Sequence, residues 1–293
     1  MIYADLHLHS LASDGSMSPS AILAQAKMIG LKALSFTDHE SLIGYYKTYQ
    51  LAQKLNLDLL PGIEMVTSYK GQEIHLLGYN FDPNHPKLIS KIQTICQERN
   101  TIAKKTIERL QKLGFTNISW EQLIPLIPTG GVAGKNHILH VLREARYIKT
   151  KEQTYYFLRQ YLAPGGQAYI HYEGNPLPKA IDLIHNANGI AVLAHPGLIR
   201  NQDLLKPILE ENLDGLEVFY YYWGNKRKEL IQYFYKIARE RNLLITGGTD
   251  FHGIYSSVKM GSIGVSSHYI KKIKEYSYRK TKPTFLKEVP RKI

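Results

Sequence analysis

Short apolar runs alternate with longer stretches of helical spacing along most of the chain. Seven runs have the length of strands, and most are continuously apolar, as in a parallel sheet that helices cover on both faces. They span residues 2–6, 33–37, 57–63, 73–79, 190–194, 215–219 and 243–246. Strand and helix in regular alternation predict an α/β fold, either open or barrel-like.

Helical segments separate most of these runs. Ser18 followed by Pro19 is a helix start, and Gly30 is its stop. A helix that ends before Gly189 has a suitable C-cap residue there. The remaining helical stretches outside the central part of the chain are residues 41–56, 178–188, 202–212 and 226–242.

Residues 86–166 interrupt this rhythm, because they contain no good strand. They hold a long helical run at 87–113, the Pro-punctuated turn "LIPLIPTGG", and helical segments near 136–146 and 151–162. We therefore expect a discontinuous barrel domain (1–85 and 167–270), a helical insert (86–166) between the fourth and fifth strands, and a basic C-terminal tail (271–293).

Charge is concentrated near the C-terminus of this 293-residue chain, whose net charge is +12. Residues 266–293 hold nine Lys or Arg and two Glu. A solvated, disordered tail and a site for an anionic partner such as RNA both explain this charge.

No apolar run approaches the roughly 20 residues of a spanning helix, and the N-terminus lacks the pattern of a signal peptide. The single cysteine, Cys96, allows no intrachain disulfide. These features predict a cytoplasmic protein without membrane association.

Histidines and carboxylates gather at matching positions of the predicted strands. Except for one within the fourth strand, they lie at or just beyond carboxyl ends, where parallel α/β folds build their sites. The set is His7, His9, Asp14, His39, Glu64, His75, His195, Asp250 and His252.

Packed together without a cation, these groups would repel one another or suffer desolvation. Divalent ions resolve this conflict, and nitrogen and oxygen ligands without thiolate favour Mn, Fe or Zn. Nine candidate ligands are too many for one ion and suit two or three. Glu64 is the candidate for a bridging carboxylate.

The motifs "DLHLHS", "TDHES", "GIE", "HLLGY", "AHPG" and "GTDFHG" resemble, in order and spacing, those of the PHP (polymerase and histidinol phosphatase) superfamily. The resemblance implies a distorted seven-stranded (βα) barrel and three metal positions. One would be held by His7, His9, Glu64 and Asp250, the second by Glu64, His75 and His195, and the third by Asp14, His39 and His252. Asp14 stands where some relatives carry His.

Two further carboxylates, Asp5 and Asp38, precede ligating histidines. Each either accepts an imidazole N–H and fixes its tautomer, or accepts hydrogen bonds from loop backbone. The sequence leaves these alternatives open.

Clustered divalent ions suit phosphoester hydrolysis by activated water, without a protein nucleophile. Cys96 lies outside the motifs, and no GxSxG elbow occurs. Asp14, His39 and His252 are the catalytic candidates, and either histidine, or a metal-bound water, could protonate the leaving group.

The insert followed by "YLAPGGQAYI" is similar to the PHP subgroup of 3′,5′-nucleoside bisphosphate phosphatases and 5′-to-3′ exoribonucleases. We expect a phosphoesterase for small nucleotides or short RNA, with no obligate protein partner. Arg99, Asn100 and Lys135 are the candidates for substrate binding, although such residues usually form a solvated helix face. Tyr220–Trp223 could stack on a base or line the barrel mouth.

Other functions remain open. Histidinol-phosphate phosphatase and proofreading exonuclease are alternatives within the superfamily. A catalytically silent metal-binding module that docks RNA is an alternative of another class.

Overall fold

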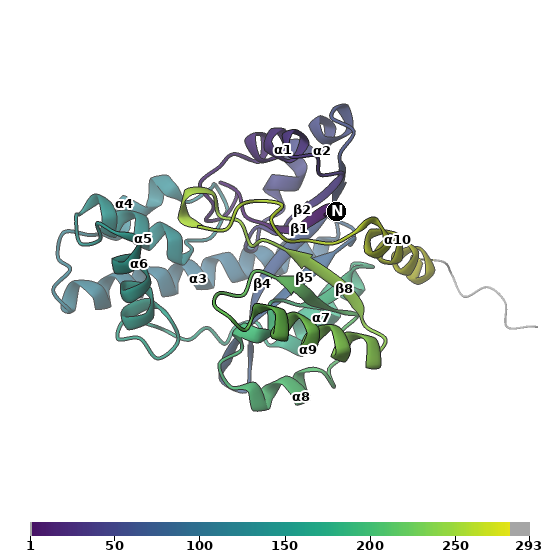
Figure 1. Ribbon diagram of the computed structural model, residues 1–293. Coiled ribbons are helices and arrows are strands. Elements are labelled where there is room, and N and C mark those ends of the chain that lie inside the picture. Colours follow the sequence, from purple (N-terminus) through teal and green to yellow (C-terminus); the bar gives the residue numbers. More distant parts are fainter. Residues whose placement is uncertain (1, 282–293) are drawn as a thin grey trace, which may run out of the picture.

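The computed structural model describes residues 2–281, which form two sheets with helices around them (Figure 1). One sheet is parallel, in the order β1 (Ala4–Leu8), β2 (Ala33–Phe36), β3 (Asp58–Leu60). The other has the sequential order β4 (Gly62–Tyr69), β5 (Gln72–Tyr79), β6 (Ile190–Leu193), β7 (Gly215–Tyr220), β8 (Leu244–Gly248).

The helices are α1 (Pro19–Met28), α2 (Ile43–Lys54), α3 (Pro86–Lys112), α4 (Trp120–Leu123), α5 (Lys135–Glu144), α6 (Lys151–Phe157), α7 (Leu177–Asn186), α8 (Leu205–Ile208), α9 (Arg227–Glu240) and α10 (Ser267–Thr281). The predicted start of α1 is confirmed, since Ser18 accepts a hydrogen bond from the Ala21 N–H. The helix predicted at 202–212 is wrong in extent. A 3₁₀ turn and the four-residue α8 replace it, and Pro207, which has no N–H to donate, lies within α8.

The α/β class is confirmed, but the prediction of one strand at 57–63 is wrong. Pro61, which has no N–H for a ladder, separates β3 from β4. Two neighbouring pairs differ from the parallel sheet that most of the apolar runs indicated, because β5 runs antiparallel to both β4 and β6. Lys70 and Gly71 form the hairpin turn with φ of 47° and 75°, as a tight two-residue turn requires.

The two sheets approach each other at two seams without forming a continuous ladder around a barrel. At one seam, an isolated bridge joins His39 to Glu64. At the other, Leu8 bridges Phe251, and the N–H of His9 donates to the carbonyl of Phe251 over 2.9 Å. Both seams therefore bring segments from distant parts of the sequence together at the ends of β1, β2, β4 and β8.

The insert extends away from the sheets along α3, and α4–α6 gather at its far side (Figure 1). It has an apolar cluster of its own, which includes Ile107, Leu110, Leu139 and Leu142. The first half of α3 instead packs into the main cluster with β4–β8, and its buried face carries Leu88, Ile92, Ile95 and Cys96. The division into barrel and insert at residue 86 remains a prediction.

The predicted basic tail begins within α10, and residues 282–293 lie outside the described part. In α10, Lys274 pairs with Asp58 and Tyr276 donates to Asp214. Within residues 2–281, no helix combines the length and apolar content that a membrane crossing requires.

Candidate metal centre

The end of β1 delivers two imidazoles to one place. His7 is in β1 and His9 directly follows it, and both side chains are fully buried. Their i, i+2 spacing places both rings on one face of extended backbone. Leu6 and Leu8, which alternate with them, lie in the apolar core on the other side.

Other elements aim carboxylates at these rings. Glu64 lies within β4 and is 1% exposed, and Asp250 follows β8. Two of the rim residues, His195 and Asp250, have positive φ values of 25° and 52°. Such strained backbone persists where the surroundings impose it, often at functional sites.

The structure brings eight of the nine predicted ligands into three overlapping groups, within which one ligand atom from each residue lies within 4.8 Å of the others. The groups are His7, His9, Glu64 and Asp250; His9, Asp14, His39 and His252; and His39, Glu64 and His75. His195 is outside these groups, but its Nε2 lies 3.2 Å from Glu64 Oε1.

Several buried atoms in these groups have short contacts without hydrogen-bond geometry. His9 Nε2 lies 3.0 Å from Glu64 Oε2 and 3.1 Å from Asp250 Oδ1, yet it makes no hydrogen bond. His7 Nε2, Asp14 Oδ1 and His39 Nδ1 are also without partners. Since buried polar atoms in native proteins are nearly always paired, a shared cation fits this donor set.

Two histidines have one ring nitrogen held by the protein, so that the other faces the cluster. Nδ1 of His7 donates to Glu217 Oε1 over 2.9 Å, and Nδ1 of His252 donates to the Asp250 carbonyl over 2.9 Å. Both arrangements are typical of metal-bound histidines.

Sequence reasoning missed Glu217, which also accepts from the His195 N–H over 2.8 Å. The sequence does contain a sign of this residue's role, because Glu217 is a carboxylate in the middle of the apolar run "GLEVF". A fully buried Glu at that position requires partners.

For Asp5 and Asp38, the backbone and hydroxyl alternative is the one the structure shows. Asp5 accepts from the N–H and hydroxyl of Thr249 and from the Gly261 N–H. Asp38 accepts from the Ser10 N–H and from two serine hydroxyls. Both carboxylates therefore hold loops in place beside the histidines.

The electrostatics of the cluster are dominated by burial and mutual attraction. Burial alone would lower the pKa of His9, but Asp250 and Glu64 outweigh it and raise that pKa to about 10. Burial would raise the pKa of Glu64, but His39, His7 and His75 hold it well below its usual value. Protons and cations therefore compete for these ligands.

The insert touches the cluster through Gly134, which precedes α5. A Cβ on Gly134 would lie 2.4 Å from Asp14 Oδ2 and 2.6 Å from Asp14 Cβ. Only glycine allows the insert to approach Asp14 this closely.

Each of the three predicted substrate-binding residues already interacts with another residue of the protein. Arg99 pairs with the buried Glu40, and Lys135 Nζ lies 2.8 Å from Glu73 Oε1. The Asn100 amide donates to the Gly131 carbonyl and accepts from the Ala133 N–H. Their role in substrate binding stays a prediction, and Asn100 is engaged by backbone at both ends of its amide.

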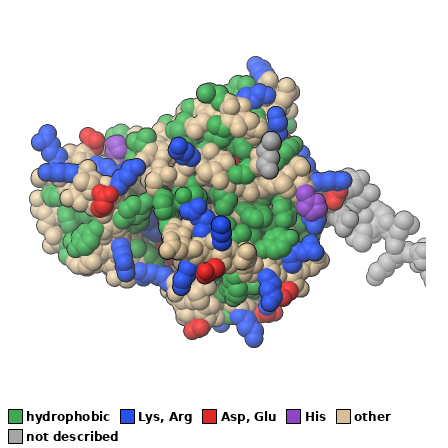
Figure 2. All heavy atoms as spheres, in the orientation of Figure 1, with side chains coloured by type: hydrophobic (Ala, Val, Ile, Leu, Met, Phe, Trp, Pro, Cys, Tyr) green, Lys and Arg blue, Asp and Glu red, His purple; other side chains and the backbone are tan. Residues whose placement is uncertain are grey.

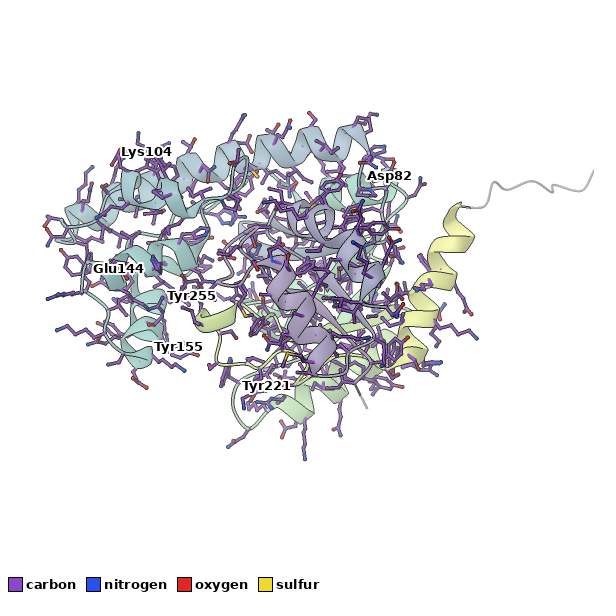
Figure 3. All side chains as sticks on the ribbon, turned by 90° about the horizontal axis from the view of Figure 1, so that it is seen from above. Asp82, Lys104, Glu144, Tyr155, Tyr221 and Tyr255 are labelled. Atoms are coloured by element: carbon purple, nitrogen blue, oxygen red, sulfur yellow. The ribbon has the colours of Figure 1, made fainter. Side chains whose placement is uncertain are left out.

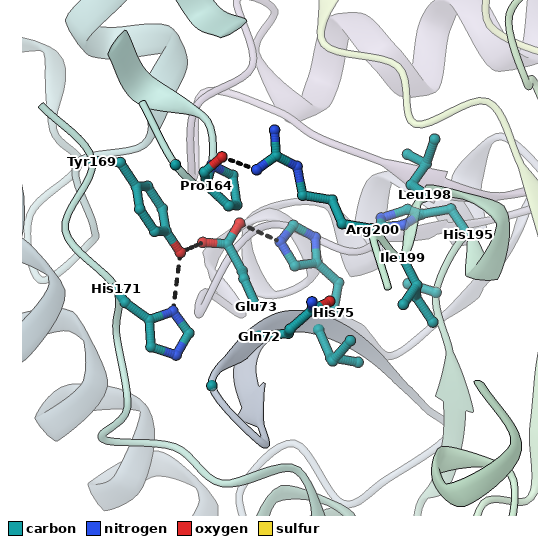
Figure 4. Close-up of a pocket in the computed structure, with 14 residues that line it drawn as sticks. Gln72, Glu73, His75, Pro164, Tyr169, His171, His195, Leu198, Ile199 and Arg200 are labelled. Carbon is teal, nitrogen blue, oxygen red and sulfur yellow. Dashed lines mark hydrogen bonds and ion pairs between the residues drawn. The ribbon is translucent and has the colours of Figure 1, made fainter. Parts of the chain in front are cut away.

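A pocket of about 380 Å³ opens beside His75 and His195. Figure 4 shows Tyr169 donating to Glu73 and contacting His171, while Arg200 reaches the Pro164 carbonyl. This pocket carries cationic or protonatable side chains next to the cluster.

The PHP domain family model matches residues 5–165, more than half of the chain. The chain therefore belongs to the PHP domain family, as its motifs predict.

Curated relatives share most of their length with this chain. A 5′-3′ exoribonuclease of Haemophilus influenzae is 29% identical over 88% of this chain and 92% of its own. A phosphoribosyl 1,2-cyclic phosphate 1,2-diphosphodiesterase of Eggerthella lenta is 28% identical over 87% and 95%. A 3′,5′-nucleoside bisphosphate phosphatase of Chromobacterium violaceum is 25% identical over 86% and 88%.

Among solved structures, a Bifidobacterium adolescentis protein described as a metal-dependent phosphoesterase has a TM-score of 0.82. It is 25% identical and covers 92% of this chain and 94% of its own. The overall fold of this chain is thus shared with that protein.

Proposed function

We propose that this chain is a metal-dependent phosphoesterase that hydrolyses phosphate esters of nucleotides or of RNA ends. The observation that carries the proposal is the set of three overlapping ligand groups with buried, unpaired nitrogen and oxygen atoms. The activities named for the three relatives, all on phosphate esters, support it.

The three groups favour two or three divalent ions, with Mn²⁺ first and Zn²⁺ or Fe²⁺ as alternatives. His9, His39 and Glu64 each belong to two groups, which lets neighbouring ions share ligands. We propose all nine predicted residues as ligands, with His195 completing the group of Glu64 and His75.

Bound divalent ions supply Lewis-acid chemistry and lower the pKa of water that attacks phosphorus. The protein's own part is orientation. Because Nδ1 of His252 is held by the Asp250 carbonyl, its Nε2 faces Asp14 as a ligand would. We therefore assign Asp14, His39 and His252 to holding the reacting centre, and we regard direct protonation by His252 as the weaker role.

For the substrate, we propose conversion of a 3′,5′-nucleoside bisphosphate to the 5′-monophosphate, or 5′-to-3′ trimming of short RNA. The pocket beside His75 and His195 supports a substrate with a second anionic group, since Arg200 and His171 line it and its one carboxylate, Glu73, is paired with Lys135. A cytoplasmic location remains a prediction that the single cysteine supports.

The test is a side-by-side assay of the Mn²⁺-loaded protein. The substrates are 3′,5′-bisphosphoadenosine, a 5′-phosphorylated RNA oligomer, a ribose 1,2-cyclic phosphate and histidinol phosphate. We expect turnover of the first or second. Turnover of histidinol phosphate alone would overturn the nucleotide assignment, and bound metal without any turnover would favour a binding module that docks RNA.

Two variants and matched controls test the site. His9→Ala and Asp250→Ala should lose metal and activity together. His268→Ala and Asp203→Asn change the same residue types at exposed positions and should keep both. Full activity of either cluster variant would contradict the assignment.

A further inference from the structure

A second pocket, of about 210 Å³, borders the cluster, and Asp250 and His252 form part of its wall. It is smaller than the roughly 300–1,000 Å³ of pockets that enclose a whole small molecule. It therefore suits one part of a ligand whose other part occupies the metal centre.

The lining of this pocket is aromatic and comes from three segments. Tyr155 belongs to α6 of the insert, Tyr221 and Trp223 follow β7, and Tyr255 follows β8. Figure 3 shows Tyr155, Tyr221 and Tyr255 around the junction between insert and barrel. We call these four side chains the aromatic wall.

Fixed contacts hold parts of the aromatic wall in place. The Arg227 guanidinium lies 3.5 Å from the centre of the Tyr221 ring, and the Trp223 ring meets Tyr221 edge-on at 5.1 Å. The Tyr155 hydroxyl lies 3.2 Å from Ser257 Oγ, which links the insert to the loop after β8. Despite these contacts, Tyr155 is 55% and Trp223 58% exposed.

The charge of the lining separates the two pockets. Each pocket has one carboxylate in its lining, Glu73 beside His75 and Asp250 in the aromatic pocket. Arg200 and His171 also line the pocket beside His75, whereas among the residues that the structure describes no Lys or Arg lines the aromatic one. The nearby Arg227 and Arg143 guanidinium groups lie over the Tyr221 and Tyr255 rings. The described lining of the aromatic pocket therefore offers a phosphate no Lys or Arg partner. A neutral, planar group is favoured, and the polar side chains of Asn136, Ser256 and Ser257 can bond to its edge.

We propose that the aromatic wall is a subsite for the nucleobase of the substrate, whose scissile phosphate lies at the metal centre. This assignment rests on the proposed function and adds where the base is held. Stacking on aromatic rings tolerates every base, so the subsite would distinguish substrates with a base from those without one and discriminate little among bases.

Binding without turnover gives the first test. The chain has two tryptophans, Trp120 and Trp223. We expect adenosine 5′-monophosphate to quench the fluorescence of the full-length protein and ribose 5-phosphate to leave it unchanged. Trp120→Phe should keep the base-dependent quenching, and Trp223→Phe should abolish it. Quenching that survives in Trp223→Phe, or that ribose 5-phosphate also causes, would overturn the assignment.

Kinetics give the second test. Trp223→Ala should raise KM for 3′,5′-bisphosphoadenosine about 5- to 150-fold, the range expected for one stacking contact, with kcat nearly unchanged. KM for ribose 3,5-bisphosphate should stay the same, and Trp223→Phe should restore most of the affinity for the base. An equal rise of KM for both substrates, or none, would overturn the subsite.

The experiments distinguish failure of the proposed function from failure of the base subsite. If the protein turns over no nucleotide, the proposed function fails, while base-dependent quenching that Trp223→Phe abolishes would still support the aromatic wall as a base-binding site. If nucleotides are hydrolysed but Trp223→Ala binds them unchanged, the subsite alone fails.

Discussion

The barrel rim and the insert meet at the same site but are built in different ways. The rim supplies all nine proposed ligands, from within strands, from strand ends and from the loops that follow them, as fully or largely buried side chains. Within residues 2–281, the insert contributes to none of the three ligand groups and reaches them through Gly134 and Lys135. Ligand position is thus fixed by the sheets, while the insert shapes the space around the ligands. Changes in the rim should therefore affect metal and chemistry, and changes in the insert should affect what binds.

The largest effect is expected inside the rim. His9 belongs to two ligand groups and His195 to none. Removing a residue that only holds a metal ligand in place typically lowers metal affinity or activity by up to about 100-fold. We expect His9→Ala to exceed that loss and His195→Ala to have the smaller effect. Metal analysis and kcat/KM at saturating Mn²⁺ measure both. Equal losses would show that His195 is as central as the family resemblance implies.

The next effect comes from the carboxylate behind the ligands. Glu217→Gln keeps one oxygen that can accept from His7 Nδ1. Its NH₂ group replaces the second oxygen, which accepts the hydrogen bond from the His195 N–H, and an NH₂ group cannot accept it. We expect a 10- to 100-fold loss of metal affinity, measured by titration with Mn²⁺. Glu240→Gln, an exposed change on α9, is the control. Unchanged affinity in Glu217→Gln would remove Glu217 from the site.

At the border of the two regions, Gly134→Ala forces a Cβ against Asp14. Overpacking of this kind costs about 1–3 kcal/mol. We expect the cost to appear as weaker metal binding in the group of Asp14 with little loss of secondary structure, and Gly134→Ser to be worse. Circular dichroism measures the loss of secondary structure, and titration with metal measures the loss of metal binding. Wild-type metal binding in Gly134→Ser would mean that the insert moves aside.

A smaller effect is expected within the insert. Lys135 is 39% exposed in its pair with Glu73, so the pair contributes only about 0–1 kcal/mol to folding. We expect Lys135→Met to melt near the wild-type temperature and to raise KM several-fold at unchanged kcat. Lys104→Met, on α3 (Figure 3), is the matched control. A fall in kcat alone would place Lys135 with the rim instead.

The smallest effect is expected at Cys96. Burial first, and then the nearby Glu40 carboxylate, raise the pKa of its thiol to about 12. Because the thiolate is the reactive form and Cys96 is buried, iodoacetamide should label the folded protein slowly at pH 8. Labelling followed by mass spectrometry checks this, with urea-unfolded protein as the control. Rapid labelling with loss of activity would reopen a cysteine mechanism.

The rim was predictable from sequence, and much of the insert's contribution was not. Ligand spacing such as His7 and His9 is local, so strand periodicity reveals it. Gly134 meets Asp14, and Tyr155 meets Ser257, only through packing between segments far apart in the sequence. The hairpin at Lys70 and Gly71 was missed for a different reason. Its turn signal is only two residues long, and the continuous apolar strands read equally well as parallel.

The sequence also did not predict how the positive charge is distributed over the surface. The basic C-terminal run suggested a local anion-binding segment, but Figure 2 shows Lys and Arg side chains scattered over both the insert and the barrel on the face displayed. A general attraction for polyanions needs no single patch, since long-range steering depends on the summed field.

The helix α3 gives the molecule a mechanical property. Its 27 residues span about 40 Å as one continuous helix, anchored at one end in the core beneath the sheets and at the other in the insert. Its anchored half reaches the neighbourhood of the ligands, because the Cys96 thiol donates to the carbonyl of Glu40, which follows His39. A tilt of about 5° near Cys96 would move the far end of α3, about 24 Å away, by about 2 Å, so small repacking near Cys96 would be passed on to the outer end of the insert.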